Sequence, residues 1–138
     1  MKEKPMSDRK KRVLVTDDEP PVVQIIRANL LLEGYEVIAA YDGVECLEKV
    51  KECKPDLIIL DVMMPRKDGW AVLGELKNNP ETELIPVVML TALSSVSDMD
   101  RGARLGNDTF LTKPFEPIEL IAIVKRLIMA SDEESLMQ

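Results

Sequence analysis

Residues 57–65 have the sequence Leu-Ile-Ile-Leu-Asp-Val-Met-Met-Pro, which is the strongest indication of the fold in this chain. The uninterrupted apolar run 57–60 predicts a strand that is buried on both faces, as in a parallel sheet covered by helices. Asp61 follows this run directly, so we expect it at the carboxyl end of the strand. Open α/β sheets bind their ligands at that edge. The pattern therefore indicates Asp61 as the first candidate functional residue.

The segments around this strand alternate between two patterns. Short apolar runs predict four more strands, at residues 13–16, 35–40, 86–90 and 108–111. Apolar residues at helical spacing predict five helices: from Pro20 to a stop at Gly34, from Asp42-Gly43 onward, from a cap at Asp68 to about Asn79-Pro80, over 95–105 and over 117–129. This alternation favours an α/β fold with a single doubly wound, five-stranded parallel sheet and helices on both faces.

Length and composition indicate the domain organisation. With 138 residues, 46% of them hydrophobic and 31% charged, the chain fits one globular domain. We expect a mobile leader at 1–11, the domain at 12–130, and an acidic tail or the start of a linker at 131–138. The net charge of -7 argues against direct nucleic-acid binding. No apolar stretch reaches membrane-spanning length and no signal-peptide core follows the charged N-terminus, so we expect a cytoplasmic protein without a membrane partner.

Histidine and cysteine narrow the possible chemistry. The sequence contains no histidine, which excludes His-based metal sites, His-dependent triads and phosphohistidine on this chain. Cys46 and Cys53 fall within one predicted helix, where their Cα atoms would lie roughly 10 Å apart, too far for a disulfide. We interpret both as small core residues.

Polar side chains gather where the predicted strands end. Asp17 and Asp18 follow the first strand, Asp61 the third, Thr91 the fourth and Lys113 the fifth. Three carboxylates in one crevice repel each other, and a hard, oxygen-preferring cation such as Mg²⁺ relieves that repulsion. An ammonium and a hydroxyl can hold phosphoryl oxygens, so one carboxylate could attack phosphorus and form an aspartyl phosphate. Each residue alone has an ordinary structural explanation, and only the combination indicates this chemistry.

The combination resembles the receiver domain of two-component response regulators. The resemblance covers about residues 12–130 and rests on Val-Thr-Asp-Asp-Glu-Pro at 15–20, on Asp61 followed by Met-Met-Pro and Asp-Gly, on Thr91-Ala92, and on Phe110 through Phe115. It implies a flavodoxin-like sheet with the strand order 2-1-3-4-5. It also implies a phosphorylation-activated signalling switch with Mg²⁺ as its cofactor.

The resemblance assigns the phosphoacceptor and the metal ligands. It makes Asp61 the phosphoacceptor and a Mg²⁺ ligand. Asp18 would bind Mg²⁺ directly, Asp17 largely through water, and Met63 through its main-chain oxygen. Met63 and Leu93 would flank the crevice, where many fast-cycling receivers carry polar or acidic residues. Two apolar side chains should hinder an attacking water, so we expect a fairly long-lived phosphoryl group.

The resemblance also assigns the residues that bind the phosphoryl group and report its presence. Lys113 would pair with the phosphoryl group, or with Asp61 before phosphorylation, and Thr91 and Ala92 would contact the phosphoryl oxygens. Thr91 would be pulled inward, and Phe110 would turn into the space that it leaves. Phe110 has no hydroxyl, so only its packing can report the state. The bond before Pro114 is expected to be cis, which places the Lys113 amine.

Partners follow from the same resemblance. The phosphoryl donor would be a sensor histidine kinase or a histidine phosphotransfer protein. Phosphorylation would change the surface of the fourth helix, fifth strand and fifth helix, and so act on a downstream effector protein or an output domain. The sequence leaves open whether the receiver stands alone or belongs to a longer regulator or hybrid kinase.

Other functions are less consistent with the residues. One alternative is a phosphorylation-independent, receiver-like protein-binding module, against which the full set of site residues argues. A Mg²⁺-dependent phosphatase of the haloacid-dehalogenase type needs a second carboxylate two residues after the nucleophile, where this chain has Met63. A flavin-binding flavodoxin is disfavoured because the acidic loop 17–21 lacks Gly and would repel a phosphate. We therefore expect only self-phosphorylation from a phosphodonor and autodephosphorylation, without turnover of an exogenous substrate.

Overall fold

The computed structural model describes residues 9–92, 96–106 and 108–137, without the side chains of 96–99 and 134–137. Strands and helices alternate through this part of the chain, as the sequence predicts. In chain order they are β1 (Arg12–Thr16), α1 (Pro20–Leu32), β2 (Glu36–Ala40), α2 (Gly43–Cys53), β3 (Leu57–Asp61), α3 (Gly69–Lys77), β4 (Val87–Thr91), α4 (Val96–Leu105), β5 (Thr109–Thr112) and α5 (Pro117–Met137).

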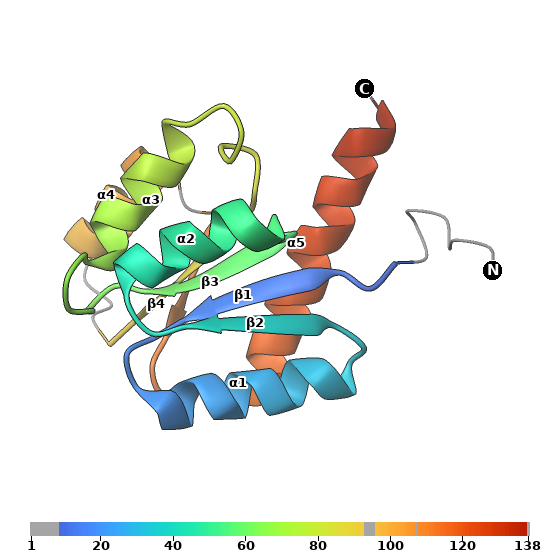
Figure 1. Cartoon of the computed structure of the whole chain (residues 1–138), viewed down its shortest axis with the longest axis horizontal. Helices are drawn as coiled ribbons and strands as arrows, with labels where there is room; N and C mark the ends of the chain where they lie inside the picture. Colours follow the sequence, from blue (N-terminus) through green and yellow to red (C-terminus); the bar gives the residue numbers. More distant parts are fainter. Residues whose placement is uncertain (1–8, 93–95, 107, 138) are drawn as a thin grey trace.

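Within the described residues, five strands form one parallel sheet in the order β2-β1-β3-β4-β5 (Figure 1). This confirms the doubly wound, flavodoxin-like α/β fold. The chain moves outward from β1 to β2, then returns past β1 to β3, so the direction of winding reverses between β1 and β3. Ligand sites of open α/β sheets lie at this reversal, outside the carboxyl ends of the strands.

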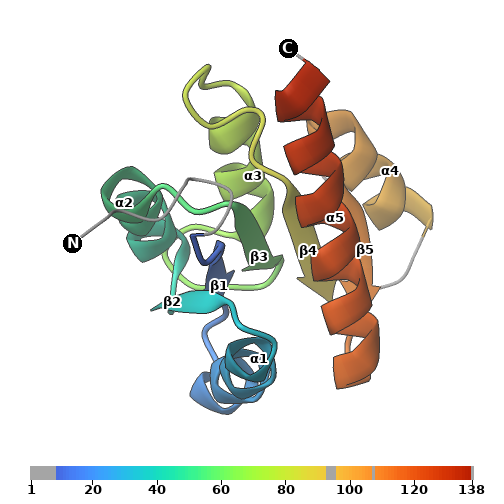
Figure 2. The same cartoon turned by 90° about the vertical axis from the view of Figure 1, so that its right-hand side faces the viewer.

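The central strand β3 packs against helices on both faces. Leu57 and Ile59 belong to the core that includes residues of α1 and α5, whereas Ile58 and Leu60 belong to the core that includes residues of α2 and α3. All four side chains are fully buried. Figures 1 and 2 show these helices arranged around the sheet. The apolar run that predicted a doubly covered strand is thereby explained, because each face needs apolar residues.

Two aspartates begin helices as predicted. Asp42 accepts a hydrogen bond from the Glu45 N–H at 2.8 Å at the start of α2, and Asp68 accepts one from the Ala71 N–H at 2.9 Å at the start of α3. Each bond satisfies one of the main-chain donors that a helix leaves unpaired in its first turn. Both helices begin at the carboxyl edge of the sheet and lead away from it, so these caps help to fix the loops there.

The last helix is longer than predicted. α5 continues to Met137, although we expected it to end at Met129 and to be followed by an acidic tail. Residues 130–137 contain no Gly or Pro, and several of them are good helix formers, so nothing in the sequence stops the helix. Asp132 also pairs with Lys11 at 2.8 Å, next to β1. Most of the expected leader, residues 1–8, lies outside the described residues.

No helix in the described part of the chain is both long and apolar enough to cross a membrane. The two cysteines are free: Cys46 is buried and Cys53 is half-buried. Burial raises the pKa of the Cys46 thiol to about 11, which keeps it in the poorly reactive neutral form. The interpretation as a core residue is confirmed for Cys46, whereas Cys53 belongs to neither core cluster.

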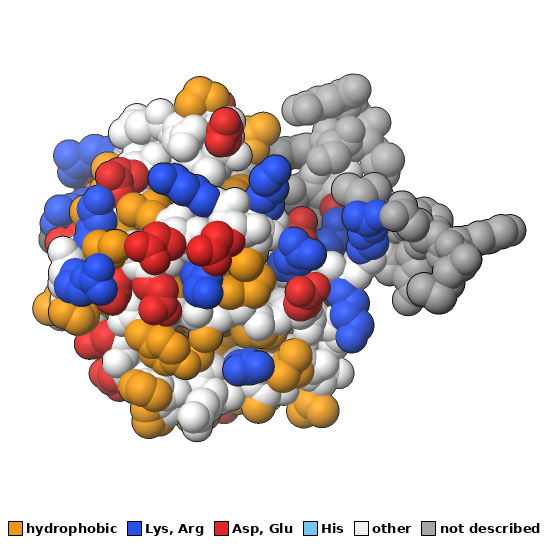
Figure 3. Space-filling model, viewed as in Figure 1, with side chains coloured by type: hydrophobic (Ala, Val, Ile, Leu, Met, Phe, Trp, Pro, Cys, Tyr) orange, Lys and Arg blue, Asp and Glu red, His pale blue; other side chains and the backbone are white. Residues whose placement is uncertain are grey.

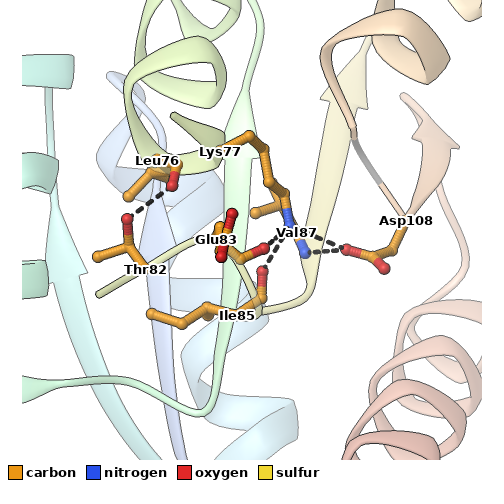
Figure 4. Close-up of polar contacts among 7 residues, drawn as sticks. All are labelled: Leu76, Lys77, Thr82, Glu83, Ile85, Val87 and Asp108. Carbon is orange, nitrogen blue, oxygen red and sulfur yellow. Dashed lines mark hydrogen bonds and ion pairs between the residues drawn. The ribbon is translucent and has the colours of Figure 1, made fainter. Parts of the chain in front are cut away.

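At the amino end of the sheet, the Lys77 side chain ties three segments together (Figure 4). Its ammonium donates to the main-chain oxygens of Glu83 at 3.0 Å and Ile85 at 2.9 Å, and lies 3.7 Å from a carboxylate oxygen of Asp108. The same Asp108 oxygen accepts a hydrogen bond from the Val87 N–H at 2.7 Å. We call Lys77, Asp108 and these main-chain partners the amino-end cluster. It joins the end of α3, the start of β4 and the turn before β5.

Candidate functional site

The first acidic residue after β1 is held in a fully buried position. Asp17 is 0% exposed, and its N–H donates to the Ala40 main-chain oxygen at 3.2 Å. One carboxylate oxygen accepts a hydrogen bond from the Glu19 N–H at 3.0 Å, and the other lies 2.7 Å from the Lys113 ammonium. Asp18 is exposed beside it. Burying the Asp17 carboxylate costs free energy of desolvation, and the ion pair with Lys113 offsets this cost.

A second buried carboxylate shares that ammonium. Asp61, at the end of β3, is 4% exposed, and its carboxylate lies 3.3 Å from the Lys113 ammonium. Lys113 directly follows β5, and its N–H donates to the main-chain oxygen of Thr91, at the end of the adjacent strand β4, at 2.8 Å. We call Asp17, Asp61 and Lys113 the carboxyl-end cluster. It holds two buried negative charges and one positive charge, so it carries an excess of negative charge.

This excess is reflected in the titration of the cluster. Burial raises the pKa of Asp61 to about 6, and the negative charge of Asp17 adds to this, while Lys113 acts in the opposite direction. Burial alone would lower the pKa of Lys113, but its hydrogen bond to Asp17 and the charge of Asp61 outweigh burial and raise it. A cation entering the cluster would therefore relieve the repulsion that the ammonium leaves uncompensated.

Two glycines shape the loop that follows Asp61. A Cβ atom on Gly69 would lie 2.3 Å from the main-chain oxygen of Asp61, and one on Gly43 would lie 2.2 Å from that of Lys67. Neither distance is possible for a side-chain carbon, so only glycine lets the loop fold back against β3 and α2. The Gly69 N–H closes the loop by donating to the Val62 main-chain oxygen at 2.9 Å. Met63 projects from this loop and is 68% exposed.

The predicted switch residues lie on the two strands beyond β3. Thr91 is buried at the end of β4, next to the Asp61 strand in the sheet. Ala92 is exposed. Phe110 on β5 is half-buried, and its ring meets the Trp70 ring edge-on, with centroids 6.1 Å apart. Phe110 therefore packs on the α3 side of the sheet. The peptide bond between Lys113 and Pro114 is cis, as the resemblance implies.

The acidic residues after β1 have the composition of a site for a hard cation. Ligand atoms of Asp17, Asp18 and Glu19 all lie within 4.8 Å of one another. All of them are carboxylate oxygens, the donors that Mg²⁺ prefers. Asp61 is not a member of this group and is linked to it through Lys113. The sequence prediction did not include Glu19, although its position directly after Asp17-Asp18 was a usable signal.

The fold and the site together define a class: a doubly wound α/β domain with an acidic site and a lysine at the carboxyl edge of its sheet. Residues 13–125 match the family model of the response regulator receiver domain. The chain belongs to this family, whose members are the receiver domains of two-component response regulators.

Curated relatives and solved structures agree with this assignment. The chain is 43% identical over 122 residues to the alkaline phosphatase synthesis transcriptional regulatory protein PhoP of Bacillus subtilis, covering 88% of this chain and 50% of PhoP. It is 42% identical over 127 residues to the probable transcriptional regulator ycf27 of Porphyridium aerugineum, covering 92% of this chain and 52% of that protein. The chain therefore spans about half the length of these relatives. The structure of chemotaxis protein CheY4 of Vibrio cholerae superposes with a TM-score of 0.82 at 32% identity, covering 86% of this chain and 99% of CheY4.

Proposed function

We propose that this protein is a phosphorylation-driven signalling switch in which Asp61 accepts a phosphoryl group. The observation that carries the proposal is the shared ammonium: two buried carboxylates, Asp17 and Asp61, lie 2.7 Å and 3.3 Å from the single amine of Lys113. Such a cluster retains a negative charge that a divalent cation can neutralise. It also places one carboxylate, Asp61, beside a cation that can bind an incoming phosphoryl group.

The proposed reaction is a phosphoryl transfer from the phosphohistidine of a sensor kinase or a histidine phosphotransfer protein. A carboxylate oxygen of Asp61 bonds to phosphorus while the bond from phosphorus to the donor imidazole breaks, and the imidazole keeps the electron pair. With its pKa raised to about 6, Asp61 is still mostly ionised at neutral pH and can act as the nucleophile. Lys113 and the Thr91 hydroxyl hold the transferred oxygens, and Ala92 lies beside them.

The acidic residues supply the proposed Mg²⁺ site. Asp18 would bind the ion directly and Asp17 largely through water, and Asp61 and the main-chain oxygen of Met63 would complete the proposed set. Mg²⁺ would neutralise the charge on the phosphoryl oxygens as they approach Asp61. Glu19 is close enough to Asp17 and Asp18 to join or tune this site.

The proposed output is a change in the surface of α4, β5 and α5. Thr91 moves toward the phosphoryl group, and Phe110 follows into the space that Thr91 leaves. Phe110 packs against Trp70, so a movement of its ring must change the packing between β5 and α3. The altered surface would act on a downstream effector protein or on an output domain. With the proposed phosphoryl donors, we expect this signalling to take place in the cytoplasm.

An apolar surface next to the site is suited to the phosphoryl donor. A groove of about 360 Å³ lies between α1 and the loop after β5, lined by Val22, Ile25, Lys113, Pro114 and Phe115. Apolar side chains also gather over α1, toward the bottom of the view in Figure 3. On this helix, Ile25 is 53% exposed and Leu32 is 84% exposed. A partner docked on this surface would deliver its phosphohistidine to the end of the sheet that holds Asp61.

The decisive experiment is the intact mass of the protein after incubation with Mg²⁺ and acetyl phosphate. The wild type should gain a single phosphoryl adduct, and the gain should be lost with EDTA and in Asp61→Asn. Asp132→Asn removes an exposed aspartate far along α5 and should leave the adduct unchanged. If the wild type gains no adduct and binds no Mg²⁺, the protein is a receiver-like binding module that works without phosphorylation.

The lifetime of the adduct is a separate proposal. Met63 is exposed just after the phosphoacceptor, whereas Leu93 lies outside the described residues. We propose that the apolar residue at position 63 slows attack by water, so autodephosphorylation of the wild type should be slow and Met63→Glu should accelerate it. Loss of the adduct within seconds in the wild type would contradict this, and Met63→Leu is the matched control that stays apolar.

A further inference from the structure

An open groove of about 710 Å³ separates α3 from α4. Its lining includes Trp70, Ala71 and Gly74 of α3 and Arg101, Arg104 and Leu105 of α4. The residues of the carboxyl-end cluster do not line it, so it is distinct from the proposed phosphorylation site. Figure 1 shows the two helices together at the upper left, on the opposite side of the molecule from α1.

The α4 wall of the groove presents two guanidinium groups. Arg101 and Arg104 are three residues apart, which places them on the same face of a helix, about one turn from each other. Among the residues that the structure describes, neither has a carboxylate within ion-pair distance. Arg101 instead lies over the ring of Trp70, 5.0 Å from its centroid. In a chain with a net charge of -7, two arginines that form no ion pair within the described residues are available to an external anionic partner.

The α3 wall is apolar and open. A Cβ atom on Gly74 would meet only the Leu105 side chain, at 4.0 Å, so the packing between the helices does not require glycine there. Ala71 adds further apolar surface to this wall, and Leu105 adds apolar surface from α4. Asp68 also lines the groove, where its carboxylate caps α3. This negative charge disfavours a compact, multiply charged anion such as phosphate, whereas a longer ligand can avoid it.

We propose that the α3–α4 groove is a docking site for an acidic peptide segment of a partner protein. Carboxylates of the peptide pair with Arg101 and Arg104, and an apolar side chain between them packs on Ala71, Gly74 and Leu105. Guanidinium groups bind carboxylates through paired hydrogen bonds, and an open groove with one charged wall and one apolar wall suits a peptide that carries both kinds of side chain. Trp70, the only tryptophan of the chain, is buried in the groove lining beneath Arg101, so a change in the Arg101 contact on docking provides an optical signal.

The test is a selection of binders from a random peptide library, with the full chain as bait. Wild-type protein should enrich peptides with two or more Asp or Glu residues next to an apolar residue. The affinity of the best peptide is then measured by Trp70 fluorescence and by calorimetry. Arg101→Gln with Arg104→Gln should weaken it about tenfold, since each paired charge at a partly exposed site contributes a modest share. Higher salt should weaken it as well.

Three controls separate the outcomes. The double substitution to Lys keeps both charges and should retain most of the affinity, whereas Arg126→Gln, on the exposed surface of α5, should change nothing. Thermal melting checks that each variant is folded. The proposal is overturned if the selected peptides are not enriched in acidic residues, if the Gln variant binds them equally well, or if inorganic phosphate displaces them at similar concentration.

Discussion

The two ends of the sheet each hold a largely buried lysine, and they use it in opposite ways. Lys77 at the amino end is matched by one carboxylate, Asp108, and by two main-chain oxygens. Lys113 at the carboxyl end faces two buried carboxylates, Asp17 and Asp61. The side chains are similarly covered, at 17% and 19% exposure. The difference therefore lies in the charges of the partners and not in burial.

This difference distinguishes a cluster that stabilises the fold from one that binds a ligand. The amino-end cluster satisfies its charges within the protein and gains nothing from an additional ion. The carboxyl-end cluster leaves one negative charge uncompensated. Burial, together with the negative charge of Asp17, raises the pKa of Asp61, so the cluster favours a cation or a proton. Substitutions in the two clusters should therefore differ in their cost and in how that cost depends on pH and Mg²⁺.

Lys113→Met should be the most destabilising change. It leaves two buried carboxylates without a cation, at an expected cost of about 3–5 kcal/mol in the free energy of unfolding. The cost should be greatest at pH 8 and smaller at pH 5, because one carboxyl group can then bind a proton. Urea unfolding at both pH values, without divalent ions, measures it. An equal cost at the two pH values would contradict the excess of negative charge.

Asp61→Asn should stabilise the protein when Mg²⁺ is absent. The pKa of Asp61 rises from 3.8 to about 6 on folding, so its favourable contribution is complete below pH 3.8 and is lost as the pH rises through 6. The stability gained by the Asn variant should thus be negligible at pH 4 and reach up to about 3 kcal/mol at pH 8. Mg²⁺ should reduce this gain by stabilising the wild type. A pH-independent gain would point to packing and not to charge.

Lys77→Met should destabilise the protein by about 2 kcal/mol, because two carbonyl groups and a carboxylate lose their donor. In contrast to Lys113→Met, the cost should be nearly the same at pH 5 and pH 8 and should not respond to Mg²⁺. Thermal or urea unfolding measures the cost, and Lys67→Met, at a surface ion pair with Glu75, is the control. A Mg²⁺-dependent cost for Lys77→Met would remove the distinction between the two clusters.

Asp132→Asn should have the smallest effect. Its pair with Lys11 is largely exposed, and such pairs contribute about 0–1 kcal/mol. The end of α5 should therefore remain helical, with unchanged hydrogen-exchange protection between residues 130 and 137. A marked loss of protection there would mean that this pair, and not the helical propensity of the segment, holds the last turns.

The fold could be predicted because its strands differ from its helices in a simple way. Strands covered on both faces must be apolar throughout, which made the run before Asp61 recognisable, and Asp42 and Asp68 showed where two helices begin. The end of α5 could not be predicted in this way. The acidic residues after Met129 are typical of a linker, yet they are equally compatible with a helix when no residue stops it.

The composition of the site could be predicted, but only part of its internal pairing. Parallel strands bring their carboxyl ends together, so Asp17, Asp61 and Lys113 had to converge once the strands were assigned. The resemblance implied Asp61 as the partner of Lys113 before phosphorylation, and this ion pair is present at 3.3 Å. The closer contact of the ammonium with Asp17, at 2.7 Å, was not predicted. Distances of this kind depend on the course of each loop. The contact of Arg101 with Trp70 likewise depends on how α3 and α4 pack, which no short motif encodes.

The packing of Lys77 has a mechanical consequence for α4. Gly106, just after the helix, is so close that an added Cβ would lie 3.1 Å from the Lys77 side chain, and Asp108 is held by the same lysine. One end of α4 is thereby fastened to the base of the sheet, while the other end begins shortly after Thr91. A helix of this length spans about 15 Å, so a tilt of about 10° moves its free end by about 2.6 Å. If α4 tilts as a rigid body, its pivot is the end beside Lys77, and a displacement near the phosphorylation site decreases along α4 toward Leu105.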